Sequence, residues 1–138
     1  MSVPVNKRSH GKLEACVKAH DLCCYTLKIT ANKKIFTEEY QTALTDKINE
    51  TALSIHMLCW TANNILVNSI EDMEQRLRLQ ETAAIECNNL LSLMGIAKSI
   101  FHLSTKRVTF WGDSVIETRN LIRAWKDADR KRYSVKFR

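Results

Sequence analysis

Residues 69–101 read SIEDMEQRLRLQETAAIECNNLLSLMGIAKSIF and carry a seven-residue repeat. Ser69, with Asp72 three residues later, predicts a capped helix start. The repeat is typical of coiled-coil-like packing, in which helices cross at shallow angles. The stretch therefore predicts one long helix packed against others. Its expected inner stripe is Met73, Leu77, Gln80, Ala84, Cys87, Leu91, Met94, Lys98 and Phe101.

Apolar side chains recur at helical spacing on both sides of this stretch, so we predict three more helices. The first covers residues 12–31, the second begins at the N-cap Thr37, and the fourth covers residues 105–132. Their expected inner faces are Leu13, Cys16, His20, Cys23, Leu27 and Thr30 in the first, Tyr40, Leu44, Ile48, Thr51, Ile55, Leu58, Ala62 and Leu66 in the second, and Val108, Trp111, Val115, Thr118, Ile122 and Trp125 in the fourth.

The connections between these helices are only a few residues long, so consecutive helices should pack antiparallel. We therefore expect an all-α fold, an antiparallel up-down-up-down four-helix bundle, over residues 12–133. A flexible basic arm of residues 1–11 precedes it, and a basic tail of residues 134–138 follows it. Three glycines and one proline argue against β-sandwich, barrel and dinucleotide-binding folds, whose turns need these residues.

The uncharged stretch between Glu50 and Glu71 is the one segment that could suggest a membrane span. It contains three asparagines and a histidine, which a lipid-facing helix would not carry. The first twelve residues are polar and basic and lack the apolar core of a signal peptide. Five cysteines without a secretory signal favour free thiols in a reducing compartment. We expect a cytoplasmic protein that does not associate with membranes.

Positive charge is concentrated at both ends of the chain, whose net charge is +6. Residues 1–34 and 105–138 are basic, whereas the middle of the chain is acidic. The first and last helices are neighbours in an up-down bundle, so their charge should merge into one side that binds polyanions. The candidate binding residues are Lys106, Arg107, Arg119, Arg123, Lys126, Arg130, Lys131 and Arg132.

Candidate chemistry in the sequence is sparse. Cys16, His20 and Cys23 share a helix face and could supply zinc ligands, but one helix rarely offers three convergent ligands. Cysteine is also a common small core residue, so we expect no metal and no cofactor, with His20 in the core or at an interface. Cys59 and Cys87 lie in apolar patterns, which indicates inert burial. We therefore expect no catalytic residue and no enzyme.

The three tryptophans, Trp60, Trp111 and Trp125, lie at apolar helix positions and are expected to pack in the core rather than stack on bases.

Two short motifs resemble a known family. Residues 33–40 read KKIFTEEY and lead into LTDKI at 44–48, and residues 121–126 read LIRAWK. Over residues 13–133 the chain is similar to the four-helix-bundle family that includes the Avd accessory proteins of diversity-generating retroelements and the proteins encoded in 23S rRNA intervening sequences. The second branch usually carries an Asn-Ile-Ala-Glu-Gly-like stretch late in its second helix. Here residues 61–65 read TANNI, a departure that favours the Avd-like branch.

The resemblance implies a non-enzymatic partner protein. Avd-like proteins form a five-membered barrel of bundles, and they bind the retroelement's reverse transcriptase and its template RNA through a basic surface. Carried over by charge and position, that surface corresponds to the eight candidate binding residues, with Lys28, Lys33 and Lys34 beside them. The alternatives are an intervening-sequence-type bundle of unknown role and an interaction module that docks an acidic protein. An all-helical small-molecule enzyme is a further alternative, for which Lys98 and Gln80 are the only inward-facing candidates.

Overall fold

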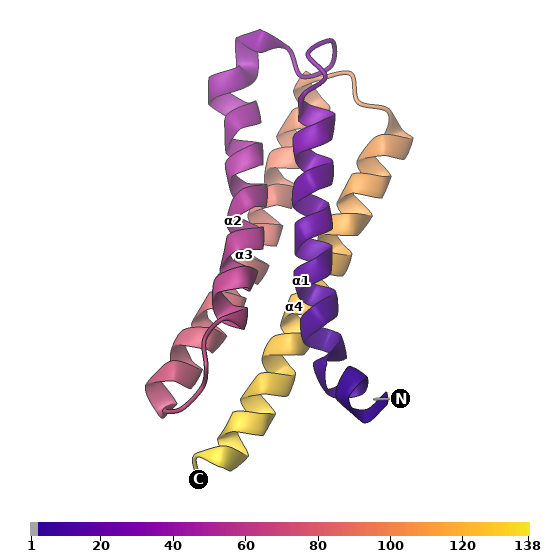
Figure 1. Ribbon diagram of the computed structural model, residues 1–138. Helices are drawn as coiled ribbons and strands as arrows, with labels where there is room; N and C mark the ends of the chain where they lie inside the picture. Colours follow the sequence, from indigo (N-terminus) through magenta and orange to yellow (C-terminus); the bar gives the residue numbers. More distant parts are fainter. Residues whose placement is uncertain (1–2) are drawn as a thin grey trace.

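The computed structural model describes residues 3–138, with side chains from Glu14 onward. These residues form four α-helices and no strand, in agreement with an all-α four-helix bundle. Figure 1 shows the α1–α2 and α3–α4 connections at one end of the bundle and the α2–α3 connection at the other, near both chain ends. The elements are α1 (Val3–Thr30), a 3₁₀ turn (Glu38–Tyr40), a π-helical turn (Gln41–Thr45), α2 (Asp46–Asn63), α3 (Ile70–Ile100) and α4 (Thr105–Lys136).

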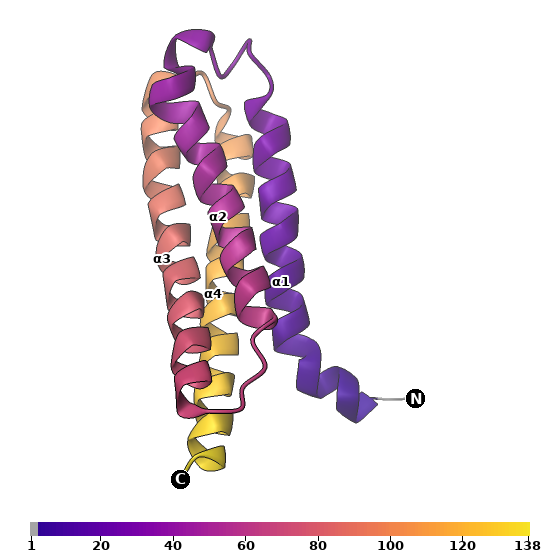
Figure 2. The same ribbon diagram turned by 60° about the vertical axis from the view of Figure 1, so that its left-hand side comes forward.

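Both terminal helices are longer than the sequence predicted. The first begins at Val3, so it includes residues 3–11, which we expected to form a flexible arm. Figure 2 shows that its first turns bend away from the other helices. At the other end of the chain, α4 continues to Lys136 and thus includes most of the expected basic tail. Lys136 of this tail is consequently held on the helix, whereas Arg138 lies beyond its end.

The helix starts differ in how they are capped. The hydroxyl of Ser69 accepts a hydrogen bond from the Asp72 amide at 3.1 Å, which confirms the predicted start of α3. Thr37 has the extended backbone of an N-cap but makes no side-chain capping bond. It is followed by the 3₁₀ and π-helical turns, so α2 begins only at Asp46. The predicted second helix is therefore irregular over its first eight residues, 38–45.

The inner face of α4 is confirmed from Trp111 to Trp125, and both of these tryptophans are buried. The predicted inner face of α1 is only partly correct, because Cys23 and Thr30 are buried as expected and other predicted positions are not. His20 and Leu27 are exposed, and the helix instead buries a stripe rotated away from them. The prediction followed the larger apolar residues and gave little weight to alanine and threonine, although these small residues allow close contact between helices. The buried side chains of α1 are Ala15, Ala19, Leu22, Cys23, Thr26, Ile29 and Thr30.

The seven-residue repeat of α3 is present, but one of its two rows is shifted by one position. The row at Gln80, Cys87, Met94 and Phe101 is buried as predicted. Lys98 is exposed, and the other predicted positions except Ala84 are only partly buried. The second buried row is Arg76, Ala83, Leu90 and Ala97. An arginine thus occupies an inner position of the bundle.

Candidate nucleic-acid interface

The fourth helix carries nine Lys or Arg residues and four Asp or Glu residues. Arg119, Arg123, Lys126 and Arg130 recur every three or four residues, which places them on one side of the helix, called here the basic flank. Arg119 donates a hydrogen bond to Asn88 Oδ1 at 2.9 Å. Lys126 donates one to Glu81 Oε1 at 2.8 Å. Because Asn88 and Glu81 belong to α3, the basic flank borders α3.

We expected the charges of the first and last helices to merge into one side, and this stays a prediction. Among the described side chains, the contact between α1 and α4 includes an ion pair at 3.3 Å between Lys18 and Glu117. The basic side chains of residues 1–13 lie outside the described part of the chain.

The eight predicted binding residues do not form a single patch. Lys106 and Arg107 lie in the first turn of α4, about 35 Å from Arg130 at 1.5 Å of rise per residue. Their surroundings differ as well. Arg130 pairs with Asp127 at 2.8 Å and Arg132 with Asp129 at 3.2 Å. Within residues 14–138, four of the eight make no side-chain hydrogen bond or ion pair, namely Lys106, Arg107, Arg123 and Lys131.

A buried ion pair that the sequence did not predict holds the C-terminal half of α4 in place. Arg76 Nε donates to Asp129 Oδ2 at 2.7 Å, and the Asp129 side chain is fully buried. Gln80 Nε2 donates to the same oxygen at 2.8 Å. Arg76 also lies 5.4 Å from the ring centre of Trp125. Such a pair needs several hydrogen bonds to offset its desolvation. Here the Asp129 carboxylate accepts them from Arg76 and Gln80 of α3 and from Arg132 of α4.

The sequence did contain a signal for this pair. Arg76 is in phase with Ala83, Leu90 and Ala97, and Asp129 follows Trp125 by four residues on the inner face of α4. Charged residues at in-phase positions can mark a buried pair. The periodicity alone could not indicate that two residues 53 positions apart would meet.

This cluster also anchors the loop between α2 and α3. Arg76 Nη1 donates to the Ile65 carbonyl at 3.2 Å, and Lys136 Nζ donates to the Val67 carbonyl at 2.8 Å. Two cations, one from α3 and one from the end of α4, therefore bind carbonyl groups of the same loop. The basic residues from Arg130 to Arg132 consequently project from a helix end that is fixed on two sides.

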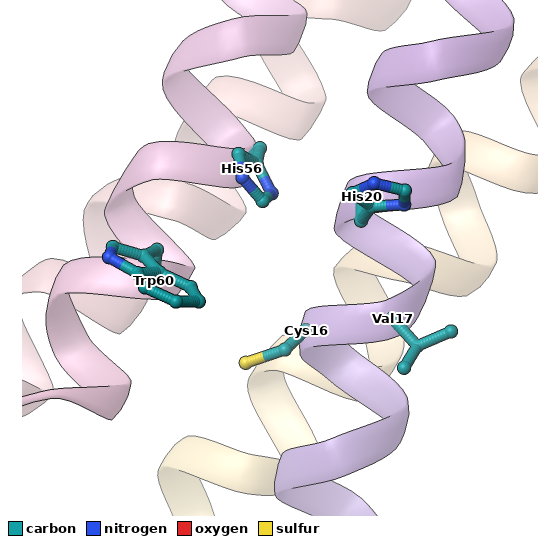
Figure 3. Close-up of a pocket in the computed structure, with 5 residues that line it drawn as sticks. All are labelled: Cys16, Val17, His20, His56 and Trp60. Atoms are coloured by element: carbon teal, nitrogen blue, oxygen red, sulfur yellow. The ribbon is translucent and has the colours of Figure 1, made fainter.

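The opposite side of the molecule, between α1 and α2, carries an apolar groove of about 200 Å³. Its rim is formed by Cys16, Val17, His20, His56 and Trp60. Figure 3 shows His20 on α1 and His56 on α2 on the two sides of the groove, and their ring centres are 5.7 Å apart. Trp60 is 55% exposed, so the prediction that it packs in the core is wrong. His20 is likewise at the surface and contacts Asp21 and Cys24.

The cysteines have the properties of core residues. Burial raises the pKa of Cys59, and it raises the pKa of Cys87 to about 12, so both thiols remain protonated at neutral pH and are poor nucleophiles. Within the described residues no group of three or more His, Cys, Asp or Glu side chains is arranged to hold a metal ion. Of the three residues considered as zinc ligands, Cys23 is buried whereas His20 is exposed.

A search of the described residues finds no helix with the length and apolarity needed to cross a membrane. Comparison with known proteins finds no matching family model, no matching curated protein and no matching solved structure. The functional evidence for this chain is therefore its own motifs and geometry.

Proposed function

We propose that this chain is a non-enzymatic accessory protein of a diversity-generating retroelement, in which the basic flank binds template RNA or cDNA and the element's reverse transcriptase. The resemblance supplies the biological setting, including the cytoplasm and the reverse transcriptase. A polyanion-binding surface is independently supported by the charge of α4. The observation that carries the proposal is the row of cations from Arg119 to Arg130 on one side of a helix.

The dimensions of this row suit a nucleic-acid strand. Eleven residues of helix span about 16 Å, and phosphates of one strand follow each other at about 3.4 Å of rise, so the row can follow several phosphates. Arg123 makes no ion pair within residues 14–138, and its charge acts on Glu81 only through a longer-range attraction, so its guanidinium is available to a phosphate. Lys126 and Arg130 must exchange a carboxylate for a phosphate, which costs little because exposed ion pairs are weak.

The sharpest test replaces two cations whose loss breaks no ion pair within residues 14–138, namely Arg123 of the basic flank and Lys131, a candidate binding residue outside the flank. In the variant Arg123→Glu with Lys131→Glu, binding of a single-stranded RNA oligonucleotide should weaken at least about tenfold. The dependence of log affinity on log salt should become shallower by about 0.7 for each lost phosphate contact. Fluorescence anisotropy at several salt concentrations measures both quantities.

The matched control is Lys47→Glu with Lys98→Glu, which changes the net charge equally at exposed positions of α2 and α3. This control should retain most of the affinity and the full salt dependence. Equal losses in the two variants would mean that RNA responds only to net charge and would remove the basic flank from the proposal.

The retroelement assignment has a separate test. It requires a reverse-transcriptase gene and a pair of near-identical repeats beside the gene for this chain. Co-expression with that enzyme should yield a complex that survives purification at moderate salt, and the Arg123→Glu, Lys131→Glu variant should release it. A genome with no reverse transcriptase nearby would favour the intervening-sequence branch of the family.

The same proposal treats an antiparallel up-down-up-down bundle as the subunit of a homo-oligomeric, pentameric barrel. Its support in the chain is the apolar strip beside the groove, where Leu53, Met57 and Trp60 are each more than two-fifths exposed. Contiguous exposed apolar surface of this kind marks interaction sites. Light scattering should give the mass of five chains, and Met57→Lys with Trp60→Lys should reduce it to that of one.

The control for this test is Ile85→Lys with Ile96→Lys on α3, where both isoleucines are similarly exposed. It should leave the mass unchanged. A monomeric unsubstituted protein would contradict the proposed assembly.

A further inference from the structure

A second hollow, separate from the basic flank, lies between the start of α4 and the C-terminal part of α1. It encloses about 280 Å³, close to the lower limit of small-molecule sites. It combines two aromatic rings, two cations and a hydroxyl, and we call it the aromatic hollow. Its lining residues are Tyr25, Ser104, Lys106, Arg107 and Phe110.

The aromatic part of the hollow is open to solvent. Phe110 is 61% exposed, whereas Trp111 and Trp125 of the same helix are buried. Its ring meets Tyr25 edge to face, with ring centres 5.2 Å apart and planes inclined at 63°. The contact with Tyr25 holds the Phe110 ring on one side and leaves much of the side chain uncovered. A held, exposed ring is the feature that single-strand binders use as a stacking platform.

The cations stand beside this ring. Lys106 precedes Phe110 by four residues and Arg107 precedes it by three, so all three side chains lie on one side of α4 within a single turn. Within residues 14–138 neither cation has an acidic partner. The first turn of a helix disfavours positive charge, and no acid in that turn offsets it. The two charges are therefore uncompensated, and an anion at this position would relieve them.

Ser104 Oγ already accepts a hydrogen bond from the Arg107 amide at 3.2 Å, so the start of α4 is capped by its own chain. What remains for a ligand is the exposed ring and the two side-chain cations.

We propose that the aromatic hollow binds one unpaired nucleotide of a single-stranded nucleic acid, with its base stacked on Phe110 and its phosphate held by Lys106 and Arg107. This inference rests on the proposed function and narrows it from nucleic acid in general to single strands. A base inside a duplex is already stacked on its neighbours and exposes only its edges. An exposed ring in a hollow of this size accepts a base only when that base is unstacked.

The hollow and the basic flank can serve one strand. Phe110 and Arg123 are thirteen residues apart on α4, or about 20 Å along the helix axis. The flank borders α3 whereas the hollow borders α1, so a strand that occupies both must cross the exposed face of α4 between them. The flank supplies attraction that is independent of strandedness, and the hollow supplies the preference for unpaired bases.

The test uses a uridine oligonucleotide of about 12 nucleotides, within the site sizes of single-strand binders, with one 2-aminopurine at its centre. Stacking on an aromatic ring quenches the fluorescence of this base, and anisotropy reports affinity separately. Binding to the unsubstituted protein should quench the probe. Phe110→Leu should abolish the quenching and weaken binding by roughly 5- to 150-fold, with the salt dependence unchanged. Lys106→Ala with Arg107→Ala should instead make the salt dependence shallower by up to about 1.4.

Two controls accompany these variants. Ile116→Ala removes an exposed apolar side chain of the same helix outside the hollow and should change neither signal. A duplex of the same length should bind the unsubstituted protein and Phe110→Leu equally well. Circular dichroism confirms that each variant keeps its helices.

The outcomes separate the two proposals. If the unsubstituted protein binds no oligonucleotide, the proposed function fails. If it binds and Phe110→Leu retains full affinity and quenching, the aromatic hollow is not a base site, while the proposed function stands. An equal loss for duplex and single strand in Phe110→Leu also overturns the inference. Displacement of the oligonucleotide by a polyglutamate peptide, with an affinity that depends on Phe110, would assign the hollow to an acidic protein.

Discussion

The two sides of this bundle are joined in different ways. Between α3 and α4 the contacts include a buried ion pair, a half-exposed ion pair from Lys126 to Glu81 and a hydrogen bond from Arg119 to Asn88. Among the described side chains, the polar contacts between α1 and α2 include a 2.8 Å bond from Thr30 to Asn49 and a long thiol contact at Cys16. Beside them lies the apolar groove, where the rings of His20 and His56 meet.

This difference indicates that the two sides of the bundle have different roles. Charged contacts have directional geometry, so the α3–α4 side is restricted to one register, and it presents the basic flank from a fixed helix. Apolar contacts are non-directional, so the α1–α2 side is held by packing and leaves Trp60 and Met57 available to another surface.

The largest effect is expected from the buried ion pair. Asp129→Ala leaves the Arg76 guanidinium charged and buried without its partner, which should lower the free energy of unfolding by about 3–5 kcal/mol. Urea denaturation followed by circular dichroism measures this change. The matched control is Asp127→Ala, which breaks only the exposed pair with Arg130 and should cost less than about 1 kcal/mol.

A double variant separates two contributions to the free energy of unfolding: the cost of leaving a buried charge without its partner, and the net contribution of the ion pair itself. Arg76→Leu with Asp129→Leu removes both charges from the same buried place, so it should be much more stable than Asp129→Ala alone. A double variant as unstable as the single one would mean that the pair, and not the orphaned charge, accounts for the loss.

The buried pair also illustrates what the sequence could predict. Periodicity and caps were sufficient for four helices, for the start of α3 at Ser69 and for the inner face of α4. They were insufficient for α1, because Cys16, His20 and Leu27 are as regularly spaced as Ala15, Ala19 and Leu22, which are the buried residues. Helix periodicity gives a repeat but not its phase when small residues form the contact.

The candidate site was predictable in composition but not in arrangement. The spacing of Arg119 to Arg130 indicated a common flank, and the structure agrees. The neighbour of that flank is a tertiary property, and Glu81 and Asn88 lie about 30 to 45 residues away in sequence at 2.8 and 2.9 Å in space. The hollow at Phe110 was missed because its second ring, Tyr25, comes from another helix.

The starts of α2 and α3 differ in capping, and this difference predicts a smaller effect on stability. Ser69→Ala removes a side-chain cap at the start of α3 and should cost about 1 kcal/mol of unfolding free energy. Thr37→Ala, which precedes the irregular start of α2, removes no capping bond and should cost a few tenths at most. Urea denaturation of both variants tests this, and equal losses would contradict the assigned difference in capping.

A smaller loss is expected from the one short hydrogen bond across the α1–α2 side. Asn49→Ala removes the acceptor of Thr30, but Thr30 Oγ1 still donates to the Thr26 carbonyl at 2.9 Å. Since no donor is orphaned, the free energy of unfolding should fall by about 0.5–1 kcal/mol. A loss as large as that of Asp129→Ala would show that the α1–α2 side depends on polar contacts as much as the α3–α4 side does.

The smallest effect is a pH dependence at Glu81. The hydrogen bond from Lys126 lowers the pKa of this carboxyl below its ordinary value. A lowered pKa in the folded state means that the pair stabilises the fold above the pKa of an unfolded Glu, about 4.3, and loses that contribution as pH falls through the lowered value. Glu81→Gln should therefore cost up to about 1 kcal/mol of unfolding free energy at pH 7 and progressively less in acid, which urea denaturation at several pH values measures.

The same substitution connects stability with the proposed binding. Glu81 competes with any phosphate for Lys126, so Glu81→Gln should release this cation while it weakens the fold. Affinity for a single-stranded oligonucleotide should then rise, by up to about fivefold if the whole energy of an exposed pair is recovered. An affinity that falls with Glu81→Gln would mean that the carboxylate holds Lys126 in its binding position, and the ion pair would then belong to the interface.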